Sequence, residues 1–354
     1  MRKTTLTLRR LGKRYDAITE CVSFDDVARL LHANPLKLMG MAMNPQYREF
    51  YIPKKDGSKR LIEDPIPILK QLQNVLNDLL QAAYYFNRSD AAYGFVTAPV
   101  EDVAPRHVLS NALRHLGTPW LLNMDMEDFF HTVSREEVQR LFQGTLFSLD
   151  KEAAELLAHL VCFKDRLPMG APTSPVLSNF ATIPLDKDLL AIAATNNWSY
   201  TRYADDMSFS ADQAFSDAHI QLISNLVHNH GFKINTSKTK RFGPDDLEKE
   251  VTGILVGGKA VQLPPDYFPN LESTIETLRQ VMEAQVQLRG TAQPENWVLN
   301  MQQRVSGKLN FARDVLGDHH PDVARLSGKY ADAVNPLDEY GPIAWLEWGY
   351  DITF

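Results

Sequence analysis

Apolar residues recur at helical spacing along most of the chain. Residues 66–86 predict a helix whose apolar face is formed by Ile68, Leu72, Val75, Leu76 and Leu79. Residues 24–31 have the same spacing, and Ser23 before them suits an N-cap, as does Ser134 before a helix ending near 147. The pattern predicts further helices over 151–162, 174–194 and 213–230, and mainly helix from 264 to about 331.

Shorter apolar runs separated by turn residues predict strands. We expect one hairpin over 49–64, turning at Asp56-Gly57, and a second over 198–210. Single strands are expected over 120–125 and near 232–234, and a third hairpin is expected to join 251–256 to 260–263. Pro264-Pro265 then interrupts the pattern. This mixture predicts an α+β fold with a domain boundary near residue 264.

Composition narrows the class of protein. The 354 residues are 44% hydrophobic and 23% charged, which is typical of a globular protein with a sizeable core. No apolar run reaches the roughly 18 residues that a membrane span needs, and the basic N-terminus lacks the apolar segment of a signal peptide. Cys21 and Cys162 fit neither a metal site nor a disulfide framework, so we expect a cytoplasmic protein with no membrane partner.

The charge of the chain is unevenly distributed. A net charge of −7 argues at first against a nucleic-acid partner. However, residues 1–14 carry six cations and no acid, and a second basic cluster contains Lys54, Lys55, Lys59 and Arg60. Such clusters can bind phosphates, although solvated surface charge is the simpler interpretation of either cluster alone.

Three aspartates are candidates for metal chemistry. Asp125 ends an apolar strand, and Asp205-Asp206 lie at the predicted turn of the second hairpin. Adjacent acids repel each other, so a buried pair needs a cation. Mg²⁺ prefers oxygen ligands, and two such ions can stabilise the attacking and leaving oxygens of phosphoryl transfer. Because a lone Asp-Asp pair is more often a solvated turn, its surroundings decide between the two interpretations.

Four segments in a fixed order resemble motifs of reverse transcriptases. Residues 122–130 (Leu-Asn-Met-Asp-Met-Glu-Asp-Phe-Phe) resemble the first palm motif, and 203–206 (Tyr-Ala-Asp-Asp) resemble the Tyr-x-Asp-Asp box. Between them, 167–175 resemble the Pro-Gln-Gly-x-x-x-Ser-Pro box; after them, 231–239 resemble Gly-Leu-x-x-Asn-x-x-Lys-Thr. The resemblance implies a magnesium-dependent, RNA-directed DNA polymerase with a right-hand fold of fingers, palm and helical thumb.

The resemblance also implies a division of the chain. The expected parts are an N-terminal helical extension (1–47), fingers (48–118 and 140–195), palm (119–139 and 196–263), helical thumb (264–331) and a C-terminal tail (332–354).

Roles follow by matching positions to the family motifs. Asp125 and Asp205 are expected to ligate two Mg²⁺ ions, with Asp206 a weaker ligand, and Lys238 matches a lysine thought to protonate the leaving pyrophosphate. Phe130 falls where the family places an aromatic steric gate against the ribose 2′-hydroxyl; alternatively it is a core residue beside Phe129.

Further positions are expected to bind the incoming deoxynucleoside triphosphate. Lys54, Lys55 and Arg60 resemble the fingers loop that clasps the triphosphate, with Arg suited to bidentate phosphate contact. Met169 and Gly170 lie in the third motif, where the family usually has Gln in place of Met169. A thioether cannot donate a hydrogen bond. If the family's Gln supports the nucleotide through such a bond, packing of Met169 must replace it here.

Two short segments resemble signatures of retron reverse transcriptases. One is Asn111-Ala-Leu-Arg-His115 and the other is Val251-Thr252-Gly253. Asn111 and His115 share a helix face. The residues expected to recognise RNA are Asn111, His115, Val251, Thr252 and Gly253. The alternative for Asn111 and His115 is that they tie the helix to the palm. The subfamily implies a cognate non-coding RNA as template and primer, priming from a guanosine 2′-hydroxyl, a multicopy single-stranded DNA product, and anti-phage defence with a separate effector protein.

Other interpretations remain within and outside the enzyme class. The chain is also compatible with another bacterial reverse transcriptase, of the group II intron-like, diversity-generating or non-retron defence type. A scaffold that only binds RNA and an effector is a further alternative, against which the intact aspartates argue.

Overall fold

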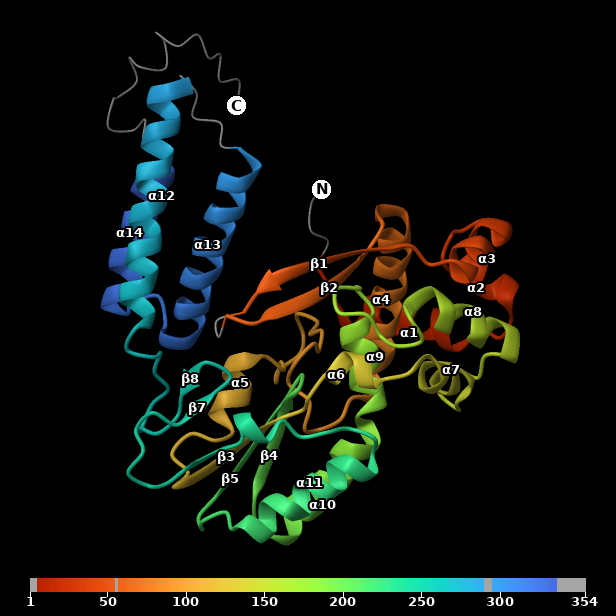
Figure 1. The fold of residues 1–354 in the computed structure, drawn as a ribbon, viewed down its shortest axis with the longest axis horizontal. Coiled ribbons are helices and arrows are strands. Elements are labelled where there is room, and N and C mark those ends of the chain that lie inside the picture. Colours follow the sequence, from red (N-terminus) through yellow and green to blue (C-terminus); the bar gives the residue numbers. More distant parts are fainter. Residues whose placement is uncertain (1–4, 55–56, 290–294, 336–354) are drawn as a thin grey trace. The chain divides into compact units, whose positions relative to one another are not determined.

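The computed structural model describes residues 5–54, 57–289 and 295–335. The chain divides into two compact units, residues 1–246 and residues 247–354 (Figure 1). The division falls between residues 246 and 247, whereas the sequence predicts a boundary near residue 264. The third predicted hairpin therefore belongs to the second unit. The assignment of segments to fingers, palm, thumb and tail stays a prediction, and residues 336–354 of the predicted tail lie outside the described residues.

The first unit begins with helices and one long hairpin. Its first elements are α1 (Leu8–Thr19), α2 (Phe24–Leu30), α3 (Pro35–Met43), β1 (Tyr47–Pro53), β2 (Lys59–Pro65), α4 (Pro67–Asn87) and α5 (Val108–Leu113). Ser23 caps α2 in a capping box with Asp26, as the sequence predicts. β1 and β2 pair antiparallel with Glu49 opposite Glu63, which confirms the first predicted hairpin.

The buried face of α4 differs from the predicted one. Ile68 and Val75 are exposed, whereas Gln73 is buried in their place together with the apolar residues Leu69, Leu76, Leu79, Leu80, Ala82, Ala83 and Tyr84. The Gln73 amide donates to Tyr47 Oη and to the carbonyl oxygen of Leu160, at 2.8 and 2.9 Å. A hydrogen-bonded polar residue therefore lies within the buried face, which a count of apolar positions cannot anticipate.

The second half of the unit contains the main sheet. Its elements are β3 (Trp120–Asp125), α6 (Phe129–Thr132), α7 (Arg135–Gln143), α8 (Lys151–Val161), α9 (Ser174–Ala181), α10 (Ile183–Thr195), β4 (Ser199–Tyr203), β5 (Asp206–Ala211), α11 (Asp217–Asn229), the 3₁₀ turn η1 (Thr236–Lys238) and β6 (Lys240–Phe242). Ser134 caps α7 as predicted. The single helix predicted over 174–194 is two helices, because Pro184 lies in the first turn of α10 and a proline there lacks the amide that would continue α9.

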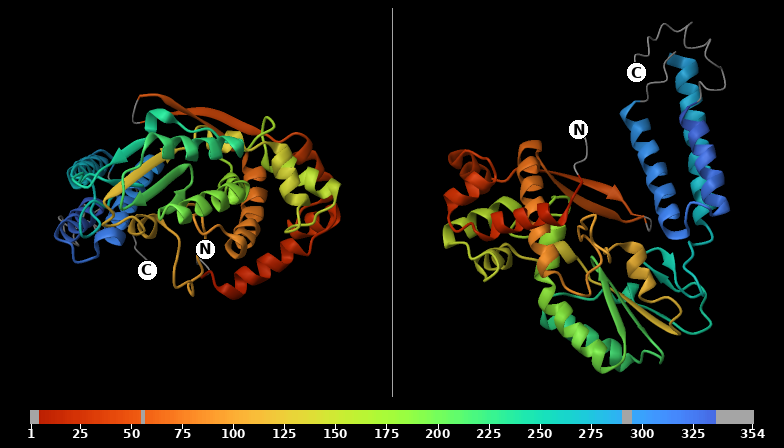
Figure 2. Two further views of the ribbon diagram at one scale, coloured as in Figure 1. Left: turned by 90° about the horizontal axis from the view of Figure 1, so that it is seen from below. Right: turned by 180° about the vertical axis from the view of Figure 1, so that it is seen from behind.

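The sheet has the order β4-β5-β3-β6 and is antiparallel throughout. Within the sheet, Leu122 of β3 lies opposite Phe209 of β5. The helices α10 and α11 lie beside each other and pack against the sheet (Figure 2). The strand predicted at 232–234 is only one bridge, between Met126 and Ile234, and the fourth strand is β6. The hairpin β4-β5 is confirmed.

The second unit combines a small hairpin with three helices. Its elements are β7 (Glu250–Val251), β8 (Ile254–Leu255), α12 (Tyr267–Arg289), α13 (Asn296–Leu316) and α14 (Pro321–Val334). This hairpin turns at Thr252-Gly253, where Gly253 at φ +85° permits a two-residue turn. The predicted pairing of 251–256 with 260–263 is present as one antiparallel bridge, between Leu255 and Gln262. The three helices share a core that includes Leu271, Val305 and Leu326, which confirms the predicted helical stretch.

Three further observations concern the chain as a whole. The predicted α+β class is confirmed. Among the helices in the described ranges, none has the length and apolar character that crossing a membrane requires. Cys21 and Cys162 are both buried and form no disulfide.

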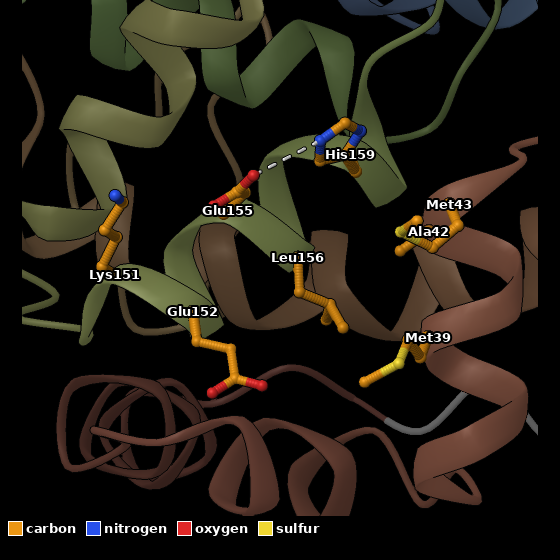
Figure 3. Close-up of a pocket in the computed structure, with 8 residues that line it drawn as sticks. All are labelled: Met39, Ala42, Met43, Lys151, Glu152, Glu155, Leu156 and His159. Carbon is orange, nitrogen blue, oxygen red and sulfur yellow. Dashed lines mark ion pairs between the residues drawn. The ribbon is translucent and has the colours of Figure 1, made fainter.

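An apolar groove of about 330 Å³ lies between α3 and α8 in the first unit. In Figure 3, Met39 and Met43 of α3 approach Leu156 of α8 across it, and His159 pairs with Glu155 at 4.0 Å on its edge. None of the predicted site residues lines this groove.

Candidate catalytic site

The sheet brings the three predicted aspartates together. Asp125 at the end of β3 lies opposite Asp206 at the start of β5. The Met126 amide donates to the main-chain oxygen of Asp205 at 3.0 Å, which ties the end of β3 to the β4-β5 turn. Asp125 is 6% exposed, Asp205 is half-buried and Asp206 is exposed. Residues 80 positions apart along the chain thus form one acidic site at a strand end.

The β4-β5 turn is held tightly against a neighbouring segment. The Arg202 amide donates to the Ala91 oxygen at 2.7 Å, and the Tyr93 amide donates to the Arg202 oxygen at 2.8 Å. Gly94 follows, and a Cβ atom there would lie 2.7 Å from the Ala204 nitrogen. Ala204 itself has φ +58°, a conformation that costs energy for a residue with a side chain. The acidic turn therefore depends on glycine at position 94.

A buried ion pair also positions this turn. Arg202 and Asp186 are both fully buried and approach to 2.7 Å. Arg202 Nη1 donates to the Ala204 oxygen and to Asn179 Oδ1, each at 3.0 Å, and Asn179 Nδ2 donates to the Gly94 oxygen at 2.9 Å. Such a pair is stable only when its remaining hydrogen bonds are made. The network joins α9, α10, the turn and residue 94 into one support.

Sequence reasoning missed these supporting residues. The one available signal is Arg202 itself, a charged side chain in a strand whose neighbours Tyr200 and Thr201 are buried. A buried arginine requires an acidic partner, but nothing local identifies Asp186 as that partner.

The electrostatics of the site favour a bound cation. Burial is the main cause that raises the pKa of Asp205, and the charge of Asp125 adds to it, while a main-chain hydrogen bond, Lys238 and Arg60 oppose the rise. Lys238 Nζ hydrogen-bonds to both carboxylate oxygens of Asp125, at 3.0 and 2.9 Å. Burial opposes the charge of Lys238, but the hydrogen bond to Asp125 and the three acidic charges outweigh it and raise the pKa of that ammonium. The carboxylates repel one another and already attract one cation.

The donor set fits Mg²⁺. Carboxylate oxygens are hard ligands, and Mg²⁺ commonly takes one or two of them together with substrate phosphates and water. Within the described residues, no group of three or more His, Cys, Asp or Glu side chains is already gathered around one point. The role of Asp125, Asp205 and Asp206 as ligands stays a prediction.

The aromatic rings of Phe130 and Phe95 form a row that ends at Tyr203 of the acidic turn. Phe129 of α6 is buried, whereas Phe130 is half-buried with its ring 6.1 Å from that of Phe95. Phe95 was not anticipated from the sequence; it is 37% exposed, has φ +58°, and lies 6.5 Å from the ring of Tyr203. Phe130 is therefore not a fully buried core residue, and its role as a steric gate stays a prediction.

The predicted nucleotide-binding residues lie on two segments. Lys54 and Arg60 are exposed on the β1-β2 hairpin, and Lys55 lies outside the described residues. Arg60 is near enough to Asp205 for its charge to lower the pKa of that carboxyl. Met169 and Gly170 lie beside β2, where the Glu63 amide donates to the Met169 oxygen at 2.8 Å. A Cβ atom on Gly170, which has φ +134°, would lie 2.9 Å from the Glu63 oxygen.

Comparison with known proteins identifies the family. Residues 52–257, more than half of the chain, match the family model described as reverse transcriptase (RNA-dependent DNA polymerase). The chain belongs to the reverse transcriptase family. This membership accounts for the four ordered motifs and confirms the right-hand polymerase fold class.

Retron enzymes are among the relatives of this reverse transcriptase. It is 32% identical to the retron Mx162 reverse transcriptase of Myxococcus xanthus over 74% of this chain and 60% of that protein. It is 28% identical to the retron Ec86 reverse transcriptase of Escherichia coli over 70% of this chain and 75% of that protein. The match thus spans 60% of the length of the Mx162 protein. A telomerase structure from Candida albicans superposes with a TM-score of 0.45 at 10% identity, covering 88% of this chain and 67% of the other.

The first retron-like segment of this reverse transcriptase is buried, which corrects the prediction of direct RNA contact. Asn111 and His115 are 1% and 0% exposed. His115 Nδ1 lies 2.8 Å from Ser210 Oγ, and Nε2 lies 2.7 Å from Thr201 Oγ1. Burial, followed by the charge of Arg114, lowers the pKa of His115 to about 3, so the ring is neutral. Burial supports the alternative interpretation, in which His115, just beyond α5, ties this segment to β4 and β5. A role of Asn111 and His115 in RNA selection stays a prediction.

The second retron-like segment of this reverse transcriptase forms the turn of the β7-β8 hairpin. Val251 is fully buried, so its side chain cannot contact RNA, and that part of the prediction is corrected. Thr252 and Gly253 are half-buried at the turn, where both have positive φ (49° and 85°). RNA recognition by Thr252 and Gly253 stays a prediction.

Proposed function

We propose that this chain is an RNA-directed DNA polymerase of the retron type, which copies a structured RNA into DNA from deoxynucleoside triphosphates. The single observation that carries the proposal is the acidic site in which Asp125 at the end of β3 lies opposite Asp206 beside the Asp205 turn. Membership of the reverse transcriptase family supports the reaction class, and the similarity to retron reverse transcriptases supports the subfamily.

The site residues would divide the reaction among metal binding, proton donation, triphosphate binding and sugar selection. Asp125 and Asp205 would hold two Mg²⁺ ions, with Asp206 a weaker ligand; such ions stabilise the attacking hydroxyl and the leaving pyrophosphate. Lys238 keeps a proton on Nζ beside Asp125 and can donate it to the leaving pyrophosphate. Lys54, Lys55 and Arg60 attract the triphosphate, and Phe130 excludes the ribose 2′-hydroxyl.

The retron relatives support a specific template and primer. In this proposal a cognate non-coding RNA supplies both, the 2′-hydroxyl of a guanosine in that RNA starts synthesis, and the product is a multicopy single-stranded DNA joined to RNA. A separate effector protein joins the complex in anti-phage defence. Nucleic acid that co-purifies with the protein tests this part: a short DNA linked to RNA supports it, and an unbranched product or none contradicts the subfamily.

Substitution of the acids tests the enzyme activity. Asp125→Asn and Asp205→Asn should each abolish extension of a primer annealed to RNA, because each removes a charged ligand from a site proposed to hold two divalent cations. RNA binding, measured by filter retention, should persist. Asp212→Asn is the matched control, since Asp212 is an exposed acid just beyond β5. Near-normal extension by either active-site variant would refute the assignment.

A further inference from the structure

Glu63 is a fully buried carboxylate outside the acidic site. It lies on β2, and Arg166 donates to both of its oxygens, from Nη1 to Oε2 at 2.8 Å and from Nη2 to Oε1 at 3.0 Å. A bidentate arginine–carboxylate pair fixes the orientation of both groups. Burial opposes ionisation of Glu63, yet Arg166 and His131 outweigh it and hold the pKa of the carboxyl below its usual range. The charge of Glu63 is therefore maintained in the interior.

The same carboxylate contacts the loop that contains Met169. The Met169 amide lies 3.4 Å from Glu63 Oε2, and the Glu63 amide donates to the Met169 oxygen at 2.8 Å. Gly170 packs so closely on the Glu63 main chain that a Cβ atom would not fit. The loop is thus positioned through its main chain. This explains how a methionine, which cannot donate a hydrogen bond from its side chain, is accommodated where the family usually has glutamine.

A third contact reaches the helix that carries Phe130. His131 Nε2 lies 3.3 Å from Glu63 Oε2, and His131 is the neighbour of Phe130 in α6. Glu63 therefore touches three segments at once: its own hairpin, which carries Lys54 and Arg60; the Met169-Gly170 loop; and α6. These are the segments to which the nucleotide-binding and gating residues belong.

We propose that Glu63, together with Arg166 and His131, is a positioning centre that sets the affinity for the incoming nucleotide and the discrimination against ribonucleotides. The inference rests on the proposed polymerase function, because it assigns a task within that reaction. Glu63 acts through its neighbours: Arg166 fixes the Met169-Gly170 loop against the hairpin, and His131 fixes the ring of Phe130. Displacement of any of these groups by a fraction of an ångström weakens substrate positioning.

The test is steady-state extension of a primed RNA template with deoxynucleotides and, separately, ribonucleotides. Glu63→Gln should raise KM for deoxynucleotides about tenfold with a smaller change in kcat, and should reduce discrimination against ribonucleotides. Arg166→Lys, which keeps the charge but loses the bidentate geometry, should mainly raise KM. His131→Gln should mainly reduce discrimination.

Glu49→Gln is the matched control. Glu49 lies directly opposite Glu63 in the hairpin and pairs with Lys164 at 2.5 Å, but the Glu49 side chain is 38% exposed and that of Lys164 is 50% exposed. This variant should keep the wild-type KM and discrimination, since exposed ion pairs contribute little.

The outcomes separate the two proposals. A wild-type protein that fails to extend any primed RNA would overturn the proposed function. The positioning role would be overturned if the wild type is active and the Glu63→Gln and Arg166→Lys variants keep its KM and discrimination. A lower melting temperature in these variants would then leave Glu63 with a structural role alone. If Glu63→Gln fails to fold, Arg166→Lys and His131→Gln decide the question by the same two measurements.

Discussion

Lys238 Nζ lies within hydrogen-bond distance of both carboxylate oxygens of Asp125, although the two residues are 113 positions apart. The pairing follows from the chain crossing the end of β3: the Asn235 amide donates to the Asp125 main-chain oxygen at 2.8 Å, and η1 then places Lys238 beside the carboxylate. The ammonium therefore attracts the same carboxylate that is proposed to bind a divalent cation.

The first prediction is that Lys238 competes with metal ions for Asp125. Lys238→Met should tighten Mn²⁺ binding measured by titration calorimetry without nucleotide, by about threefold, because the competing charge is partly exposed and screened. Catalytic extension should fall in the same variant if Lys238 is the proton donor. Lys240→Met, which removes an exposed charge two residues further on, is the control. Unchanged or weaker Mn²⁺ binding would exclude the competition.

The second prediction concerns the aromatic ring of Phe130. Phe130→Ala should admit ribonucleotides, raising their incorporation relative to deoxynucleotides about tenfold or more, because the ring no longer occupies the space beside the 2′-hydroxyl. Extension assays with each nucleotide type measure this ratio. A variant that remains active on deoxynucleotides but still excludes ribonucleotides would show that Phe130 only packs against Phe95 and Phe129.

The third prediction concerns His115. His115→Ala should destabilise the protein by roughly 2–4 kcal/mol, because it leaves Thr201 and Ser210 without a buried partner. Extension of a generic primer and synthesis on the cognate RNA should then fall together with the melting temperature. Selective loss of the cognate reaction at an unchanged melting temperature would restore an RNA-recognition role.

The neutral state of His115 also predicts a pH dependence. Its pKa is about 3 in the folded protein against 6.5 for the free side chain, so the unfolded state binds the proton first. Stability is therefore complete above pH 6.5 and declines as the pH falls toward 3, with a cost of roughly 2 kcal/mol at pH 5. Denaturant unfolding at pH 7 and pH 5 measures the difference. His115→Gln should flatten it, whereas His228→Gln, at an exposed site, should leave it unchanged.

The fourth prediction concerns the contact between Gly94 and the acidic turn. Gly94→Ala should reduce DNA synthesis about tenfold or more, because the new methyl group pushes Ala204 and the neighbouring Asp205 out of position. Gly40→Ala is the control: Gly40 lies in α3 with open space around it, so this change should stabilise the protein by about 0.5–1 kcal/mol. Full activity of Gly94→Ala would show that the turn adapts to the added atom.

Local features of the sequence determined much of the fold. The caps at Ser23 and Ser134, the β1-β2 and β4-β5 hairpins and the strand ending at Asp125 all depend on residues within a few positions of one another. Short-range hydrogen bonds and side-chain alternation specify such elements. The order of the aspartates and Lys238 along the chain likewise sufficed to indicate the reaction class, because the motifs that contain them are contiguous.

Only the tertiary structure decided which polar residues are buried and with what partners. The motif predicted that His115 contacts RNA, yet its ring is buried against Thr201 of β4 and Ser210 of β5. Gln73 and Arg202 are likewise buried within faces that the pattern treats as apolar or exposed. Glu63 and Arg166 are 103 positions apart. A buried polar group is tolerated only when a specific distant group meets it, and the folding of the whole chain, not any local pattern, brings those two groups together.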